Sequence, residues 1–206
     1  ISGEFPTSQL NRLPASPYYL EAVVTALKKA GLLRTYYRDR LRGYRLGAKA
    51  KLVLLDGWPE RFTFCLTGDA ETNRLKSEAN RRFRLHRLAE TYITMGNAGV
   101  LLYPDEKPKV FAQTGFGGEA VTYPVFYSSR EVKELGADAT QIRSSRFAGV
   151  LLVPTGIFVT YNSGGALMKW RYKSELRVKT LLWNILCQQR LAQQYRVEQV
   201  HGLVLG

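Results

Sequence analysis

Apolar residues recur at the helical period across residues 17–30, and this pattern predicts an amphipathic helix. Ser16 suits the N-cap, Pro17 the first helical position and Gly31 the residue that ends the helix. The apolar stripe consists of Leu20, Val23, Val24 and Leu27. At about 100° per residue, the opposite face of the helix carries Tyr18, Ala22, Thr25 and Lys29.

The neighbouring residues complete an order of elements. A short helix is expected within residues 7–13, and Pro14 favours a turn between it and the amphipathic helix. Beyond Gly31, residues 32–37 and 43–46 have the pattern of two strands, and the residues that connect them are mostly arginine. The order is therefore helix, turn, helix and basic hairpin.

The segment that carries this order is LPASPYYLEAVVTALKKAGLLRTYYRDRLRGYRL, residues 13–46. It resembles the winged helix-turn-helix DNA-binding proteins as a class. In organisation, as a winged helix followed by an α/β domain, the chain also resembles the replication-relaxation proteins of bacterial plasmids and conjugative elements. The first resemblance implies that the second helix enters the major groove of DNA, while the arginine-rich loop lies on the backbone or reaches the minor groove.

Two sets of residues are then expected to contact DNA. The residues expected to face base edges are Tyr18, Tyr19, Ala22, Thr25 and Lys29. The residues expected to hold phosphates are Lys28, Arg34, Arg38, Arg40, Arg42 and Arg45.

One element of a winged helix is missing from this pattern. A winged helix has a further helix before these two, and only residues 1–5 precede the short helix. We therefore expect the first helix to be absent from the winged-helix domain, residues 1–56, and to lie upstream or to come from a partner chain. Residues 1–5 are also compatible with a remnant of cloning.

Residues 57–206 predict a second domain in which helices and strands alternate irregularly. Residues 49–58, at the boundary between the two domains, fit either a short helix or a strand. Residues 61–66, inside the second domain, fit a strand or an irregular linker. Long helices are expected over residues 70–95 and 173–195. Strands are expected at residues 99–103, 109–113, 120–127, 147–153, 156–161, 166–170 and 198–205, with a short helix at 128–136. The fold class is thus α+β, with a mostly antiparallel sheet flanked by two long helices in the second domain.

The charge of the chain indicates a polyanionic partner. The protein has 206 residues, a net charge of +13 and a pI near 9.9. Ten Lys or Arg residues and only three acidic residues lie in residues 1–51, so over half of the net charge falls in a quarter of the chain. Arginine binds phosphate through paired hydrogen bonds, and double-stranded DNA is therefore the expected partner. A basic face that binds an acidic protein is the alternative.

The long helix expected over residues 70–95 is itself basic. Its cationic residues are Arg74, Lys76, Arg81, Arg82, Arg84 and Arg87. They would form either a second phosphate-binding surface or the ordinary solvent-facing side of a helix that links two domains.

A nuclease-like pattern is the catalytic arrangement that the sequence offers. Asp105, Glu131 and Lys133 match the PD-(D/E)xK motif, in which two carboxylates hold Mg²⁺ and a lysine lies near the attacking water. The motif needs its second acid and its lysine on a strand, but Glu131 and Lys133 begin an expected helix, where residues two apart face different ways. We therefore expect that the protein is not an enzyme, with a Mg²⁺-dependent nuclease as the alternative.

The sequence gives little sign of metals, cofactors or membranes. Cys65 and Cys187 have apolar neighbours, which is typical of buried thiols, and His86 and His201 complete no zinc-ligand spacing. Neither a phosphate-binding glycine motif nor a run of 18 apolar residues occurs. We expect a cytoplasmic bacterial protein without a cofactor that controls transcription, or the replication or transfer of a mobile element. Its second domain would form a homodimer or recruit a replication or transfer protein.

Overall fold

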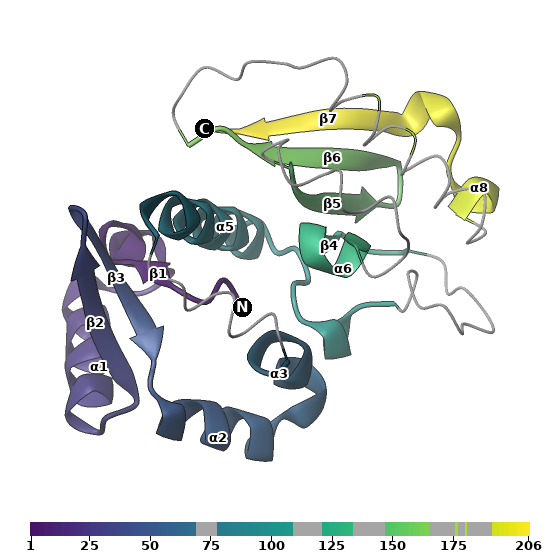
Figure 1. Ribbon diagram of the computed structural model, residues 1–206. Helices are drawn as coiled ribbons and strands as arrows, with labels where there is room; N and C mark the ends of the chain where they lie inside the picture. Colours follow the sequence, from purple (N-terminus) through teal and green to yellow (C-terminus); the bar gives the residue numbers. More distant parts are fainter. Residues whose placement is uncertain (69–77, 109–120, 134–146, 165–175, 177–179, 181–190) are drawn as a thin grey trace. The chain divides into compact units, whose positions relative to one another are not determined.

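The computed structural model divides the chain into two compact units (Figure 1). It describes residues 1–68, 78–108, 121–133, 147–164, 176, 180 and 191–206. The first unit contains residues 1–98 and 103–105, and the second contains residues 99–102 and 106–206. Each unit has its own sheet, and the fold class is α+β. The boundary that we predicted after residue 56 lies inside the first unit.

The first unit contains a three-stranded antiparallel sheet with strand order β1-β3-β2. Its strands are β1 (Phe5–Pro6), β2 (Leu33–Arg38) and β3 (Leu41–Leu46). Its helices are η1 (Thr7–Arg12), α1 (Pro17–Lys29), α2 (Ala48–Gly57), α3 (Pro59–Leu66) and α5 (Ala79–Asn97). The short helix η2 (Pro104–Glu106) has its first two residues in this unit and its last in the second.

Helix α1 forms as its sequence predicts. The Ser16 hydroxyl accepts a hydrogen bond from the Tyr19 N–H at 3.3 Å, and Pro17 occupies the first turn. Gly31 has a φ of 71°, the left-handed conformation that ends the helix. Of the apolar stripe, Leu20 is buried, whereas the other three members are only partly buried.

The hairpin is tighter than predicted. Its strands run in register from Leu33 opposite Leu46 to Arg38 opposite Leu41, so the turn contains two residues rather than five. Those two residues, Asp39 and Arg40, have φ values of 52° and 59°. Two consecutive left-handed residues match the twist of a two-residue hairpin, which is why the strands continue to the turn.

Helix α3 corrects the expectation of a strand or linker over residues 61–66. Pro59 begins the helix, and Phe62, Cys65 and Leu66 then share one helical face, with the last two buried. Residues 61–64 alternate between polar and aromatic side chains, so the segment also fits the period of a strand. The preceding segment, for which a short helix or a strand was expected, forms helix α2.

The two faces of the β2–β3 hairpin bear different helices. Lys28 of α1 lies over the ring of Tyr44, and Arg82 of α5 lies over the ring of Tyr36. Tyr44 pairs with Thr35, next to Tyr36 in β2, so the two rings point to opposite faces. We call these the α1 face and the α5 face of the hairpin.

The second unit contains a four-stranded sheet with order β4-β5-β6-β7. The first three strands are antiparallel and β7 is parallel to β6, which confirms a mostly antiparallel sheet. Its core includes Val125, Val150, Leu152 and Ile157. The elements are β4 (Val125–Ser128), α6 (Ser129–Lys133), β5 (Phe147–Val153), β6 (Gly156–Asn162), α8 (Leu191–Gln194), η4 (Val197–Gln199) and β7 (Val200–Leu205).

Several predicted elements are shorter than expected or lie outside the described residues. Leu101 forms only an isolated bridge with Val125 in place of the strand predicted at residues 99–103. The strands predicted at 109–113 and 166–170 lie outside the described residues, as does most of the helix predicted over 173–195. The long helix α5 belongs to the first unit. No helix within the described ranges has the length and apolar character needed to cross a membrane.

Candidate nucleic-acid interface

The outer face of α1 presents the side chains predicted to read bases. Tyr18 is 85% exposed and Tyr19 is 61% exposed. Ala22, Thr25 and Lys29 are exposed as well. Because the apolar stripe points the other way, this polar face is available to a ligand along the length of the helix.

Four of the predicted phosphate ligands are exposed on the hairpin. They are Arg34, Arg38, Arg40 and Arg42. Arg40 lies in the turn, and Arg42 is opposite Tyr37, which is 68% exposed. Arg42 and Tyr37 belong to the α1 face, because they are two residues from Tyr44 and Thr35. The α1 face of the hairpin therefore carries an exposed cation, Arg42, opposite an exposed aromatic ring, that of Tyr37.

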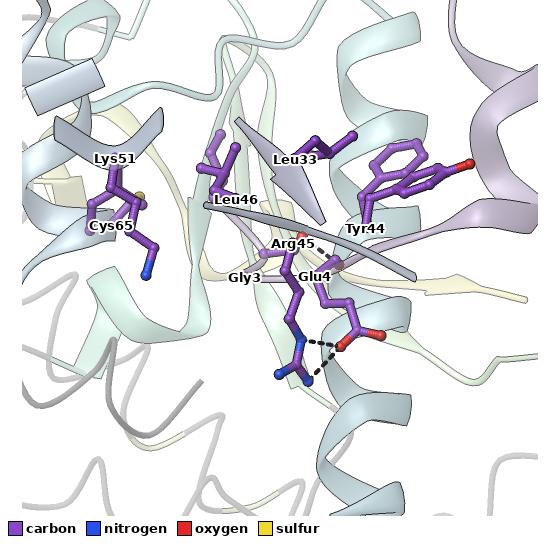
Figure 2. Close-up of a pocket in the computed structure, with 12 residues that line it drawn as sticks. Gly3, Glu4, Leu33, Tyr44, Arg45, Leu46, Lys51 and Cys65 are labelled. Carbon is purple, nitrogen blue, oxygen red and sulfur yellow. Dashed lines mark hydrogen bonds and ion pairs between the residues drawn. The ribbon is translucent and has the colours of Figure 1, made fainter. Parts of the chain in front are cut away.

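The other two predicted phosphate ligands are placed differently. Lys28 is partly buried, with its Nζ 4.9 Å from the centroid of the Tyr44 ring. Arg45 is on the α5 face, where its Nε lies 2.7 Å from Glu4 Oε2 and its side chain is only 11% exposed. Figure 2 shows the Arg45 guanidinium directed at the Glu4 carboxylate. Its charge is therefore already matched inside the unit.

Arg82 of α5 is the least exposed cation of this region, with a side chain of 0% exposure. Its Nη2 lies 2.6 Å from Glu4 Oε1. It also donates to the hairpin carbonyls of Arg38 at 2.7 Å and Leu41 at 3.0 Å. The expectation that the basic residues of this helix bind phosphate or face solvent is thus wrong for Arg82, which supports the hairpin turn from within.

Glu4 is the centre of this buried network. Burial alone would raise its pKa, but hydrogen bonds from His86, Arg82 and Arg45 outweigh burial and lower the pKa to about 2. His86 Nε2 lies 2.7 Å from Glu4 Oε1 and must carry the hydrogen, because an ionised carboxylate only accepts. Gly43 makes room for this arrangement, since a Cβ there would clash with the Glu4 side chain. Residues 1–5 are thus integral to the unit.

A sequence signal for Arg82 exists, although we did not use it. Arg82, Leu85, Ala89 and Tyr92 are all buried and share one face of α5. An arginine in register with an apolar stripe indicates a buried ion pair. The sequence holds no comparable signal for Glu4, because its partner lies 78 residues away.

A pocket of about 230 Å³ lies beside the network (Figure 2). It is lined by residues 1–5, by parts of β2 and β3, and by Lys51, Cys65 and Leu66. Two of the charged side chains at its wall, Glu4 and Arg45, bind each other, and Lys51 is a third.

The three residues of the nuclease pattern occupy ordinary structural positions. Asp105 belongs to the first unit and accepts from Arg61 Nε at 2.8 Å. Glu131 belongs to the second unit, where its carboxylate binds Lys107 and accepts from the Ser128 N–H at 2.7 Å. The side chain of Lys133 lies outside the described residues.

Glu131 lies in a helix rather than on a strand, as its serine cap predicts. Next to it, Lys107 also donates to the Phe126 carbonyl at 2.9 Å, and the Tyr127 hydroxyl donates to the Pro108 carbonyl at 2.6 Å. Burial, helped by the Glu131 charge, raises the pKa of Tyr127 well above its ordinary value. These contacts form a packed polar core, and the described residues contain no cluster of His, Cys, Asp and Glu that could hold a metal.

Comparisons with known proteins add no family to this description. No protein-family model, no curated protein and no solved structure matches the chain. The role of the interface is therefore argued from its own geometry and charge.

Proposed function

We propose that the first unit is a winged helix-turn-helix and that the protein is a non-enzymatic, sequence-specific DNA-binding protein. The order of elements supports this proposal: β1, η1, α1, β2 and β3 follow one another, and β1 joins the sheet beside β3. A short strand before two helices and a hairpin, closed into one small sheet, is what a winged helix requires after its first helix.

The single observation that carries the proposal is the shared exposure of α1 and the hairpin arginines. The outer side of α1 is about 20 Å long for its 13 residues, and a helix of this size fits the major groove. Tyr18, Tyr19, Ala22, Thr25 and Lys29 then face base edges. Lys28, Arg34, Arg38, Arg40 and Arg42 neutralise phosphates. We leave Arg45 out of this set because Glu4 already binds it.

The biological role that fits this proposal is control of transcription, or of the replication or transfer of a bacterial mobile element. It rests on the resemblance in organisation to replication-relaxation proteins and on the net charge of +13. The second unit then binds a replication or transfer protein, and the protein works in the cytoplasm, where its DNA is.

Selection from a random pool of duplex DNA across a salt series tests the proposal. We expect the retained sequences to share a motif, and the logarithm of affinity to fall with the logarithm of salt at a slope of about −0.9 for each phosphate bound. Retention without a shared motif contradicts sequence reading, and no retention at low salt favours a basic surface for an acidic protein. Plasmid cleavage with Mg²⁺ that Glu131→Gln abolishes would instead favour the nuclease.

A further inference from the structure

Helix α2 presents a stripe of exposed residues that DNA binding does not use. Lys49, Leu52, Val53 and Asp56 are spaced as i, i+3, i+4 and i+7, so they lie on one face of the helix. All four are exposed, Leu52 at 68% and Val53 at 52%. We call this set the α2 stripe.

The α2 stripe is distinct from the side of α2 that builds the unit. Ala50 is buried, Leu54 is partly buried, and α2 packs against α3. Trp58, the residue that follows α2, is also exposed, at 57%. Adjacent large apolar side chains that remain in water on a short helix are typical of a surface that another protein covers.

The charges of the α2 stripe would allow it to pair with the same stripe of a second copy. Lys49 lies at its N-terminal end, Asp56 lies at its C-terminal end, and the apolar Leu52 and Val53 lie between them. Within the described residues, neither Lys49 nor Asp56 forms an ion pair. If two copies of α2 lie antiparallel about a two-fold axis between residues 52 and 53, Lys49 meets the partner's Asp56 twice, and Leu52 meets the partner's Val53 twice.

We propose that the α2 stripe is a self-association surface through which two copies of this chain pair with antiparallel α2 helices. The occupant is a second copy because an isologous interface needs a self-complementary patch, and the stripe has that symmetry. A partner that was only acidic would oppose Asp56, and one that was only basic would oppose Lys49. The inference goes beyond the proposed DNA binding and does not depend on it.

The expected dimer is reversible rather than permanent. Ten residues of helix span about 15 Å, so this pairing buries less area than the roughly 1,200–2,000 Å² of a standard stable interface. Association should therefore depend on protein concentration and, through its charge pairs, on salt.

Charge reversal of the full chain, followed by sedimentation equilibrium, tests the pairing. Lys49→Asp places two acids together at both symmetric contacts, and Asp56→Lys places two bases together. Each variant alone should dimerise roughly tenfold more weakly than the parent. Mixed in equal amounts, they should form a heterodimer of parental strength, because each chain now carries the charge that the other needs. The double variant Lys49→Asp/Asp56→Lys should recover the homodimer.

A substitution in the apolar centre of the α2 stripe tests the same pairing. Leu52→Asp should abolish dimerisation, whereas Phe83→Asp, at an exposed apolar position of α5, should leave it unchanged. Recovery in the mixture requires two folded chains, so it cannot be confused with misfolding. A parent that stays monomeric at every concentration, or a mixture that associates no better than its components, overturns the proposal.

Discussion

The buried and the exposed arginines around the β2–β3 hairpin have opposite roles. On the α5 face, Arg45 and Arg82 are almost completely removed from water and share the Glu4 carboxylate. On the α1 face, Arg42 is exposed, although only two residues separate it from Arg45 in the same strand. Burial beside Glu4, and not residue type, decides which arginine supports the fold, because Arg34 and Arg38 share the register of Arg45 and are nevertheless exposed.

The contrast separates stability from binding. A buried guanidinium keeps its charge only because a carboxylate and carbonyl oxygens replace its water, so removing one partner leaves the rest uncompensated. An exposed guanidinium keeps its water and contributes little to folding. Substitutions of the buried arginines should therefore affect the free energy of unfolding, and those of the exposed arginines should affect affinity for DNA.

The largest effect is expected for Arg82→Met. The change keeps much of the side-chain volume but leaves Glu4 without its closest cation and frees the hairpin carbonyls. We expect the free energy of unfolding of the first unit to fall by about 3–5 kcal/mol. Hydrogen exchange of the hairpin amides under native conditions measures it. Arg84→Met, at an exposed position of the same helix, is the matched control. Equal losses of stability in the two variants would contradict a special role of the buried arginine.

Acid should weaken the first unit through Glu4. Its pKa is about 2 in the folded protein against 4.5 for an ordinary glutamate, so the network contributes fully above pH 4.5 and its contribution is lost as the pH falls towards 2. The loss should approach about 3 kcal/mol. Unfolding measured from pH 6 to pH 2 should show this slope in the parent and not in Glu4→Gln, and parallel pH profiles would refute the role of Glu4.

On the α1 side, Arg40→Gln/Arg42→Gln should weaken binding to every DNA sequence by about tenfold to a hundredfold. Two lost phosphate contacts should also reduce the steepness of the salt dependence by about 2. Fluorescence anisotropy across a salt series measures both quantities. Stability should be almost unchanged, and a double variant that binds like the parent at low salt would remove the hairpin from the interface.

A smaller and more selective effect is expected on α1. Thr25→Ala or Tyr18→Ala should cost about 1–3 kcal/mol of discrimination at the base positions that each side chain contacts, while the salt slope stays the same. Repeating the sequence selection with each variant shows which positions of the motif lose their preference. A uniform loss across all sequences would mean that these side chains contact the backbone instead.

The smallest effect is expected for Arg40→Gly. Arg40 has a φ of 59°, which glycine adopts at lower cost, so the substitution should raise the stability of the hairpin by about 1 kcal/mol. The same substitution removes a phosphate contact and should weaken DNA binding. Higher stability together with weaker DNA binding would show that Arg40 is strained in the fold and contacts phosphate. Higher stability with unchanged or stronger DNA binding would argue against a phosphate contact.

Local signals predicted much of this fold. Ser16, Pro17 and Gly31 fix the limits of α1 through backbone hydrogen bonds and allowed dihedral angles, which depend on few neighbours. The β5–β6 hairpin and the serine cap of α6 were predictable for the same reason.

The missed features depend on contacts distant in sequence. The Glu4–Arg82 pair joins residues 78 apart, and no local rule links them. Residues 61–66 satisfy two periods at once, and only the burial of Cys65 and Leu66 selects the helix. The exposure of the outer side of helix α1 was predictable from the periodicity of the helix, whereas the loss of Arg45 from the interface required the position of Glu4.

The two-residue turn of the hairpin has a consequence for the thermodynamics of recognition. Asp39 and Arg40 join the two strands by the shortest common turn, and Arg82 binds the carbonyls on both sides of that turn. A longer loop would lose conformational entropy on meeting DNA, but this hairpin has already lost that entropy during folding. Association should therefore proceed almost as a rigid body, with a heat-capacity change that the buried surface alone accounts for.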